Sequence, residues 1–123
     1  MNSIDMPIFE VETWRVIPGK EYEHEEALRV WMTWVREHKE LFPEWRSLRY
    51  FVKYIAGEET DRHMMVWEYE SLADYEKYKA RRANYEGPYA DYKKVDPYHM
   101  GLFDKSTMSV EVWKDNDRDL WIE

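Results

Sequence analysis

The sequence contains neither cysteine nor glutamine, and it has no long hydrophobic run. Without cysteine, disulfide bonds, thiolate catalysis and cysteine-ligated zinc are excluded. A membrane-spanning helix needs about twenty apolar residues, and a secretory signal needs a basic start before an apolar stretch. Neither pattern occurs, so we expect a cytoplasmic protein with no membrane partner. Missing glutamine beside abundant glutamate, lysine and arginine is typical of proteins from thermophiles.

Basic residues are too few to favour a nucleic-acid partner. The chain has 18 lysines and arginines against 26 aspartates and glutamates, which gives a formal net charge of -8 at pH 7. Such a charge repels a phosphate backbone, and the basic cluster within residues 77–82 is too local to reverse the balance. We therefore expect no nucleic acid among the partners.

Aromatic residues are abundant, with 7 tryptophans and 10 tyrosines among the 123 residues. This is more than the core of one small domain requires. Tryptophan and tyrosine combine a large apolar area with a polar tip, so they suit subunit interfaces and ligand pockets. The composition predicts an oligomer or a pocket.

Apolar residues that alternate with polar ones predict four strands, and apolar residues spaced three and four apart predict helices. The predicted strands are residues 8–17, 48–55, 62–69 and 106–114. The predicted helices are residues 21–41, 71–83 and, inside a long aromatic loop, 88–94. A polar hairpin loop at residues 56–61 should join the second and third strands, and Ser71 with Asp74 is typical of a helix cap.

This order predicts an α+β, ferredoxin-like βαββαβ domain, with a four-stranded antiparallel sheet and both main helices on one face. Residues 1–123 are expected to form this one domain, with residues 115–123 as a C-terminal tail. The other sheet face would then be bare. We expect this face to carry Glu10, Trp14, Arg49, Phe51, Lys53, Trp67 and Trp113. A second copy packed sheet against sheet would cover it, which predicts a homodimer with a ligand space between the sheets.

Three segments of the chain carry a resemblance to a known family. They are FEVETWRVIPGK at residues 9–20, VWEYESLADY at residues 66–75 and YADY at residues 89–92. They resemble the NIPSNAP-type branch of the dimeric α+β barrel superfamily, over nearly the whole chain. That superfamily includes antibiotic-biosynthesis-type monooxygenases that need no cofactor, haem-degrading enzymes and many members without an assigned activity. The resemblance implies a dimeric α+β barrel.

The resemblance does not extend to the haem-degrading members. These relatives carry a histidine on the second helix, where this chain has Tyr78, Lys79 and Ala80, and an asparagine on the first strand, where it has Thr13 and Trp14. We therefore disfavour haem and expect no cofactor. The predicted function is binding of a hydrophobic or aromatic small molecule, with cofactor-independent monooxygenation as the activity; a non-catalytic ligand-binding or structural dimer is the alternative.

His99 is the first candidate for chemistry, because it lies in the aromatic loop of residues 84–105 and histidine titrates near neutral pH. As a general base it would remove a proton from a phenolic or enolic substrate, and the resulting anion would react with oxygen directly. The plainer interpretation is that His99 only anchors the loop. The residues predicted to bind the substrate are Tyr54, Trp67, Tyr89, Tyr98, Trp34 and His38.

The other histidines have plainer interpretations. His63 is a second catalytic candidate, because it shares a sheet with Glu10, Glu12 and Glu111 and the four suggest a metal site. No close ligand spacing is visible, so pairing of these carboxylates with Arg49 and Lys53 is favoured and no metal is predicted.

His38, beside Trp34 on the first helix, is favoured as a structural residue, with a place in a pocket wall as the alternative. His24 is expected to be solvated in an acidic first turn. A zinc-protease motif would need a second ligand where Leu28 stands.

Overall fold

The computed structural model describes residues 6–55 and 62–123, so the predicted hairpin loop at residues 56–61 lies outside the described residues. All four predicted strands are confirmed, and they pair antiparallel in the order β2-β3-β1-β4. The strands are β1 (Ile8–Val16), β2 (Trp45–Val52), β3 (Arg62–Tyr69) and β4 (Phe103–Lys114). β2 and β4 begin earlier than predicted, because Trp45 pairs with Tyr69 and Phe103 pairs with Val16.

The helices lie where they were predicted, although the first ends four residues earlier than expected. They are α1 (Glu21–Glu37), α2 (Leu72–Arg82) and α3 (Tyr89–Val95), and a short 3-10 turn follows α1 at Lys39–Leu41. The side chain of Ser71 accepts a hydrogen bond from the backbone N–H of Asp74 at 3.1 Å, which confirms the predicted cap of α2. No helix in the described part of the chain is long and apolar enough to cross a membrane.

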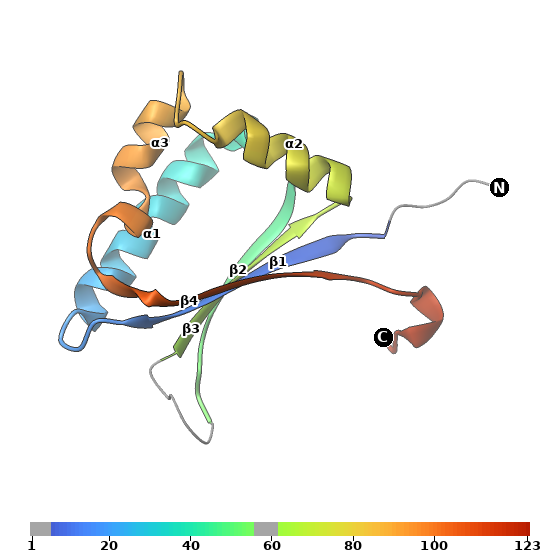
Figure 1. Cartoon of the computed structure of the whole chain (residues 1–123), viewed down its shortest axis with the longest axis horizontal. Coiled ribbons are helices and arrows are strands. Elements are labelled where there is room, and N and C mark those ends of the chain that lie inside the picture. Colours follow the sequence, from blue (N-terminus) through green and yellow to red (C-terminus); the bar gives the residue numbers. More distant parts are fainter. Residues whose placement is uncertain (1–5, 56–61) are drawn as a thin grey trace.

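The three helices lie together on one side of the sheet, while β4 runs along its edge and leads to the C-terminal segment (Figure 1). This arrangement confirms the predicted ferredoxin-like α+β fold. It leaves the opposite face of the sheet without a covering layer in the described chain.

The assignment of side chains to the two faces was partly wrong. Glu10 and Trp14 were expected on the bare face, yet they point toward the helices and are only 1% and 5% exposed. Trp67 is the strand partner of Glu10 and lies on the same covered face. The alternation of β1 was read correctly, but alternation alone does not say which set of side chains a helix will cover.

The bare face carries the other set of side chains. Phe51 and Trp113 are 41% and 59% exposed there, as predicted, and Arg49 lies beside them. Phe9 and Val11 belong to the same face, because Phe9 pairs with Trp113 in the sheet. This face therefore combines apolar and charged side chains.

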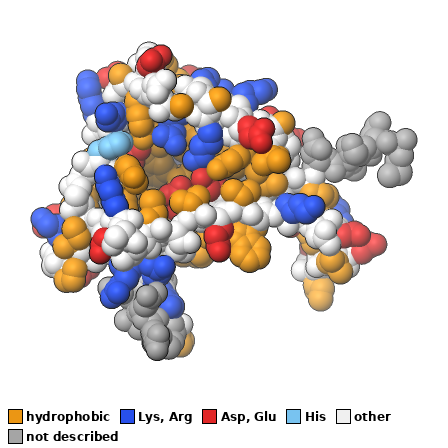
Figure 2. Space-filling model, viewed as in Figure 1, with side chains coloured by type: hydrophobic (Ala, Val, Ile, Leu, Met, Phe, Trp, Pro, Cys, Tyr) orange, Lys and Arg blue, Asp and Glu red, His pale blue; other side chains and the backbone are white. Residues whose placement is uncertain are grey.

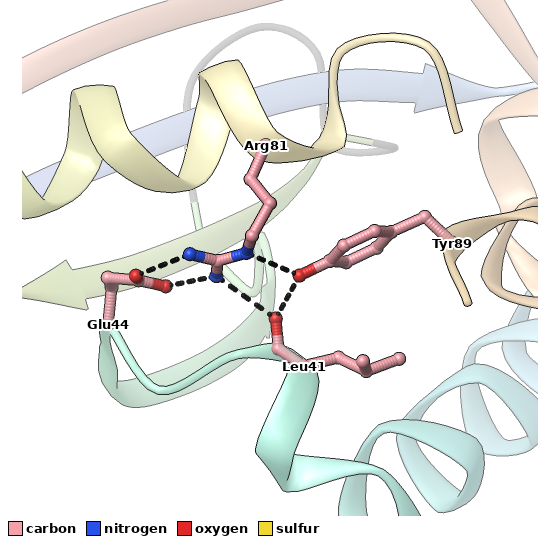
Figure 3. Close-up of polar contacts among 4 residues, drawn as sticks. All are labelled: Leu41, Glu44, Arg81 and Tyr89. Carbon is pink, nitrogen blue, oxygen red and sulfur yellow. Dashed lines mark hydrogen bonds and ion pairs between the residues drawn. The ribbon is translucent and has the colours of Figure 1, made fainter. Parts of the chain in front are cut away.

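A polar network ties α2 and α3 to the segment that follows α1 (Figure 3). The guanidinium of Arg81 donates hydrogen bonds to both carboxylate oxygens of Glu44, at 2.6 and 2.8 Å, and to the hydroxyl of Tyr89 at 2.8 Å. Tyr89 in turn donates to the backbone carbonyl of Leu41 at 2.5 Å. Because Arg81 bonds the buried Glu44 carboxylate, it lowers the pKa of that group. The network holds the helices in place over the sheet.

Candidate functional site

A cavity of about 460 Å³ lies between the covered face of the sheet and the helices. Small-molecule pockets in proteins usually measure roughly 300–1,000 Å³. Figure 2 shows the hollow, with acidic and basic side chains inside a largely hydrophobic rim. Val110 and Val112 lie on the helix side of β4 yet are 51% and 46% exposed, so the cavity opens along β4.

The position of the cavity corrects the sequence interpretation. We expected a ligand space between the sheets of two copies. The cavity instead lies within one chain, on the opposite face of the sheet. Aromatic side chains lie between the helices and the sheet, and in the described part of the chain no helix covers the side along β4.

Aromatic rings from several elements form much of the cavity wall. The ring centre of Trp31 on α1 lies 6.1 Å from that of Trp45 and 6.4 Å from that of Trp67. Further rings come from α2, from α3 and from the short turn that follows α3. They are Tyr75, Tyr78, Tyr92 and Tyr98. Such a wall offers flat apolar surfaces on which an aromatic or hydrophobic molecule can stack.

A buried ion pair stands in this aromatic surrounding. The Nζ atom of Lys79 on α2 lies 2.9 Å from the Oε2 atom of Glu10, and Glu10 is almost fully buried. A buried carboxylate requires such a partner, because an unpaired charge loses its hydration without compensation.

The predicted pairing of the strand carboxylates with Arg49 and Lys53 is therefore wrong for Glu10. Glu111 lies on the bare face, opposite Val11, and cannot join Glu10 at one site. In the part of the chain that the structure describes, no group of three histidine or acidic side chains could hold a metal ion.

Glu12 is the carboxyl group in the cavity that has no partner of its own. It is half-buried, and within residues 6–55 and 62–123 it makes no hydrogen bond or ion pair. Burial, and to a smaller extent the nearby carboxylate of Glu10, raise its pKa from 4.5 to about 7, although Lys79 and Arg82 oppose the shift. Near neutral pH this carboxyl can therefore both accept and release a proton.

Arg82, Tyr85 and Asp96 form a second polar group on the cavity wall. Arg82 donates to the hydroxyl of Tyr85 at 2.9 Å, and this hydroxyl donates to Asp96 at 3.0 Å. Tyr85 has a φ of +51°, which is uncommon for a bulky residue, so these contacts hold it in a strained position. The Nε atom of Arg82 is buried and has no partner among the described residues.

His99 lies outside the cavity wall but touches this group. It is exposed, and its Nε2 atom lies 3.3 Å from the Tyr85 hydroxyl. The structure therefore connects His99 to the cavity through Tyr85. Its role as a general base stays a prediction.

His24 was expected to be solvated, and this was wrong, since it is 1% exposed and lies on the cavity wall. The indole N–H of Trp14 donates to its Nε2 atom at 2.9 Å, so the proton of the neutral ring sits on Nδ1. Burial lowers its pKa to about 4, and His63 contributes to the shift. The signal was present in the sequence, because His24, Leu28 and Trp31 follow the spacing of one helix face.

His63, the second catalytic candidate, is buried next to His24. The centres of the two rings are 5.0 Å apart, and the hydroxyl of Tyr50 hydrogen-bonds the Nδ1 atom of His63. These side chains form a polar cluster at the edge of the cavity, where His24 provides the contact with the space itself.

Two of the predicted substrate-binding residues, Trp67 and Tyr98, lie on the cavity wall. Tyr89 is buried in the network with Arg81. Trp34 and His38 stack on each other with ring centres 3.8 Å apart.

Tyr54 is 85% exposed beyond the end of β2. The structure thus brings Trp67 and Tyr98 together at the cavity and places the other four residues elsewhere. Their predicted roles in binding stay predictions.

No protein-family model and no curated protein sequence matches this chain. Solved structures with the same fold include a NIPSNAP family protein from Agrobacterium tumefaciens, with 20% identity, a TM-score of 0.63 and coverage of 96% of this chain and 93% of that chain.

An antibiotic-biosynthesis-monooxygenase-like protein from Caulobacter crescentus is 14% identical, with a TM-score of 0.61 and 93% of each chain covered. A NIPSNAP-like domain protein from Burkholderia xenovorans is 18% identical, with a TM-score of 0.59 and coverage of 92% of this chain and 88% of that chain. The chain therefore has the α+β fold of NIPSNAP-like and antibiotic-biosynthesis-monooxygenase-like proteins, as the sequence resemblance implied.

Proposed function

We propose that this protein binds a hydrophobic or aromatic small molecule in the cavity between its helices and its sheet. The observation that carries the proposal is the cavity of about 460 Å³, in which indole and phenol rings form much of the wall. A guest that stacks on these rings removes apolar surface from water, while the few charged groups of the wall orient it.

Nitrobenzene is a suitable probe, because it is aromatic and carries no ionisable group. We expect saturable binding of one molecule per chain, detected as quenching of tryptophan fluorescence, since Trp31, Trp45 and Trp67 surround the space. Met108→Phe adds bulk at the cavity wall and should weaken binding, whereas Ser109→Phe adds the same ring on the other face of β4 and should not. Absence of saturable quenching would overturn the proposal.

Cofactor-independent monooxygenation is the second candidate function. It is supported by the contact of His99 with Tyr85, which links a histidine to the cavity, and by the likeness to the Caulobacter crescentus protein. The base removes a proton from the substrate, and the resulting anion gives electrons to dioxygen. When a methylene becomes a carbonyl, one oxygen atom enters the product and the other leaves as water.

Anthrone is a substrate of this kind, because its methylene lies between two aromatic rings. We expect consumption of one dioxygen per anthrone in an oxygen electrode, above the rate without protein and without added cofactor. His99→Ala should abolish turnover and leave the melting temperature unchanged. A wild-type protein that binds anthrone without consuming oxygen would instead support the non-catalytic alternative.

The proposal includes a homodimer formed through the bare sheet face. Phe51 and Trp113 are exposed on this face, beside the opposite charges of Arg49 and Glu111, and such a mixed surface suits a second copy. A second copy would also shield the exposed apolar side chains of Leu120 and Ile122 in the C-terminal segment from water. Light scattering should give the mass of two chains for the wild type and of one for Phe51→Lys. A wild-type monomer at micromolar concentration would contradict the dimer.

A further inference from the structure

Glu12 lies on the cavity wall, on the strand β1 between β3 and β4. Its strand partners are Met65 on β3 and Val110 on β4, both apolar and both on the cavity wall. The carboxyl group is therefore flanked by side chains that offer it no hydrogen bond. Within the described ranges it is a proton acceptor that faces an open space and has no partner.

The charged groups around Glu12 are Glu10 on β1, Lys79 and Arg82 on α2, and Asp96 after α3. The neutral phenol groups of Tyr75 and Tyr85 line the same cavity. Lys79 is engaged by Glu10 at 2.9 Å, and Asp96 accepts a hydrogen bond from Tyr85 at 3.0 Å. Arg82 bonds only the neutral Tyr85 hydroxyl and has no ion pair in the described part of the chain. A free carboxyl and an unpaired guanidinium thus share one cavity.

This combination discriminates between classes of ligand. A guest without polar groups leaves both Glu12 and Arg82 without a partner. A carboxylic acid arrives already ionised at neutral pH, so it can pair with Arg82 but has no acidic proton to give to Glu12. A phenol or an enol arrives neutral, can give its proton to Glu12 and then presents an oxyanion to Arg82.

We propose that the ligand of this cavity is a hydroxylated aromatic or enolic compound, that Glu12 accepts its hydroxyl proton and that Arg82 binds the resulting oxyanion. This inference rests on the proposed function and names the ligand class. The oxygen–hydrogen bond of the ligand breaks, and a new one forms on the Glu12 carboxylate. The total charge of the site does not change, because the negative charge moves from Glu12 to the ligand beside Arg82.

This scheme assigns the ligand proton to Glu12 in place of His99, the base of the second candidate function, so only one of the two assignments can hold. Glu12 is part of the cavity wall, whereas His99 reaches the space only through the hydroxyl of Tyr85. A variant of each residue therefore separates the two assignments.

The test compares 4-nitrophenol with nitrobenzene, which has the same ring and nitro group but no hydroxyl. Ionised and neutral 4-nitrophenol absorb at different wavelengths, so the spectrum reports the state of the bound probe. At pH 7, where about half of the Glu12 carboxyl groups are ionised, we expect the probe bound to the wild type to be more ionised than the free probe. Glu12→Gln should bind nitrobenzene as the wild type does and lack this excess of the ionised form, and His99→Ala should keep it.

Arg82→Met gives an independent test, because it retains an apolar stem and removes the cation. It should weaken 4-nitrophenol binding roughly tenfold and leave nitrobenzene binding nearly unchanged, since only the oxyanion needs the guanidinium. If both probes bind but bound 4-nitrophenol is no more ionised than the free probe, or if Glu12→Gln keeps the excess of the ionised form, the inference fails and the proposed function stands. If neither probe binds, both fail.

Discussion

The two faces of the sheet carry the same types of side chain, which are buried on one face and exposed on the other. On the covered face, Trp14 and Glu10 are almost fully buried, and Glu10 has an ion pair with Lys79. On the bare face, Trp113 is 59% exposed and donates a hydrogen bond of 3.3 Å to the exposed Glu111. The same residue types thus become core, cavity wall or surface according to the layer that lies over them. The helices, and not the strand sequences, make one face a candidate site.

The largest expected difference between the faces concerns their tryptophans. Trp14→Ala should lower the free energy of unfolding by about 3–5 kcal/mol, because it removes a buried ring from the core and leaves a cavity. Trp113→Ala should change it by no more than about 0.5 kcal/mol in a monomer, because that ring is largely hydrated already. Urea unfolding of both variants at low protein concentration checks the comparison.

Equal losses from the two substitutions would contradict the view that only one face is covered. A loss for Trp113→Ala that grows with protein concentration would sharpen the comparison instead, because it would show that a second copy covers the bare face.

A second difference concerns the pH dependence of the covered face. The pKa of Glu12 is raised from 4.5 to about 7 in the folded chain, so folding favours its protonated form. Its contribution to stability is complete below pH 4.5 and is lost as the pH rises to about 7, which amounts to about 3 kcal/mol. Glu12→Gln should remove this part of the pH dependence between pH 4.5 and 8, measured by urea unfolding.

Glu76→Gln, on the exposed surface of α2, is the matched control for Glu12→Gln. It removes one carboxylate at a hydrated position and should leave the pH profile of the wild type intact. A Glu12→Gln profile identical to that of the control would show that Glu12 ionises as a hydrated group does.

The network around Arg81 holds the helices that create the covered face. Arg81→Ala should destabilise the protein by about 2 kcal/mol, because it leaves the buried Glu44 carboxylate without its charged donor. Thermal unfolding measures the effect, with Arg36→Ala on the exposed side of α1 as the control. If this network keeps the helices in position over the cavity, Arg81→Ala should also weaken nitrobenzene binding. Unchanged binding would show that the helices keep their position without it.

The smallest expected effect is spectroscopic. His24 should remain neutral between pH 5.5 and 8, because burial lowers its pKa to about 4, and its proton should reside on Nδ1, because Nε2 accepts a bond from Trp14. Nitrogen chemical shifts of the imidazole ring in a pH titration measure both properties. Titration of His24 near pH 6.5 would indicate a hydrated ring in place of the buried one.

Local patterns predicted most of the secondary structure. Alternation located β1 and β3, and the pairing of Ser71 with Asp74 located the start of α2. The short helix in the aromatic loop was also predicted, with its ends displaced by one residue. These features depend on neighbours in the chain, so the sequence is sufficient to recognise them.

The candidate site was only partly predictable. Trp67 and Tyr98 were named before the structure placed them on the cavity wall. His24 was missed because its acidic neighbours suggested a hydrated turn. Arg82 and the raised pKa of Glu12 were missed because they depend on groups from β1 and α2, which are far apart in the chain.

Local patterns were enough to specify the order and type of the elements and the alternation within each strand, because these follow from backbone geometry and the nearest side chains. Which face of the sheet the helices cover depends on tertiary packing. The same packing brings a carboxyl group and an arginine together in one cavity. Burial and electrostatic interaction act through space, so a glutamate that looks ordinary in β1 acquires a pKa of about 7 only when the helices lie over it.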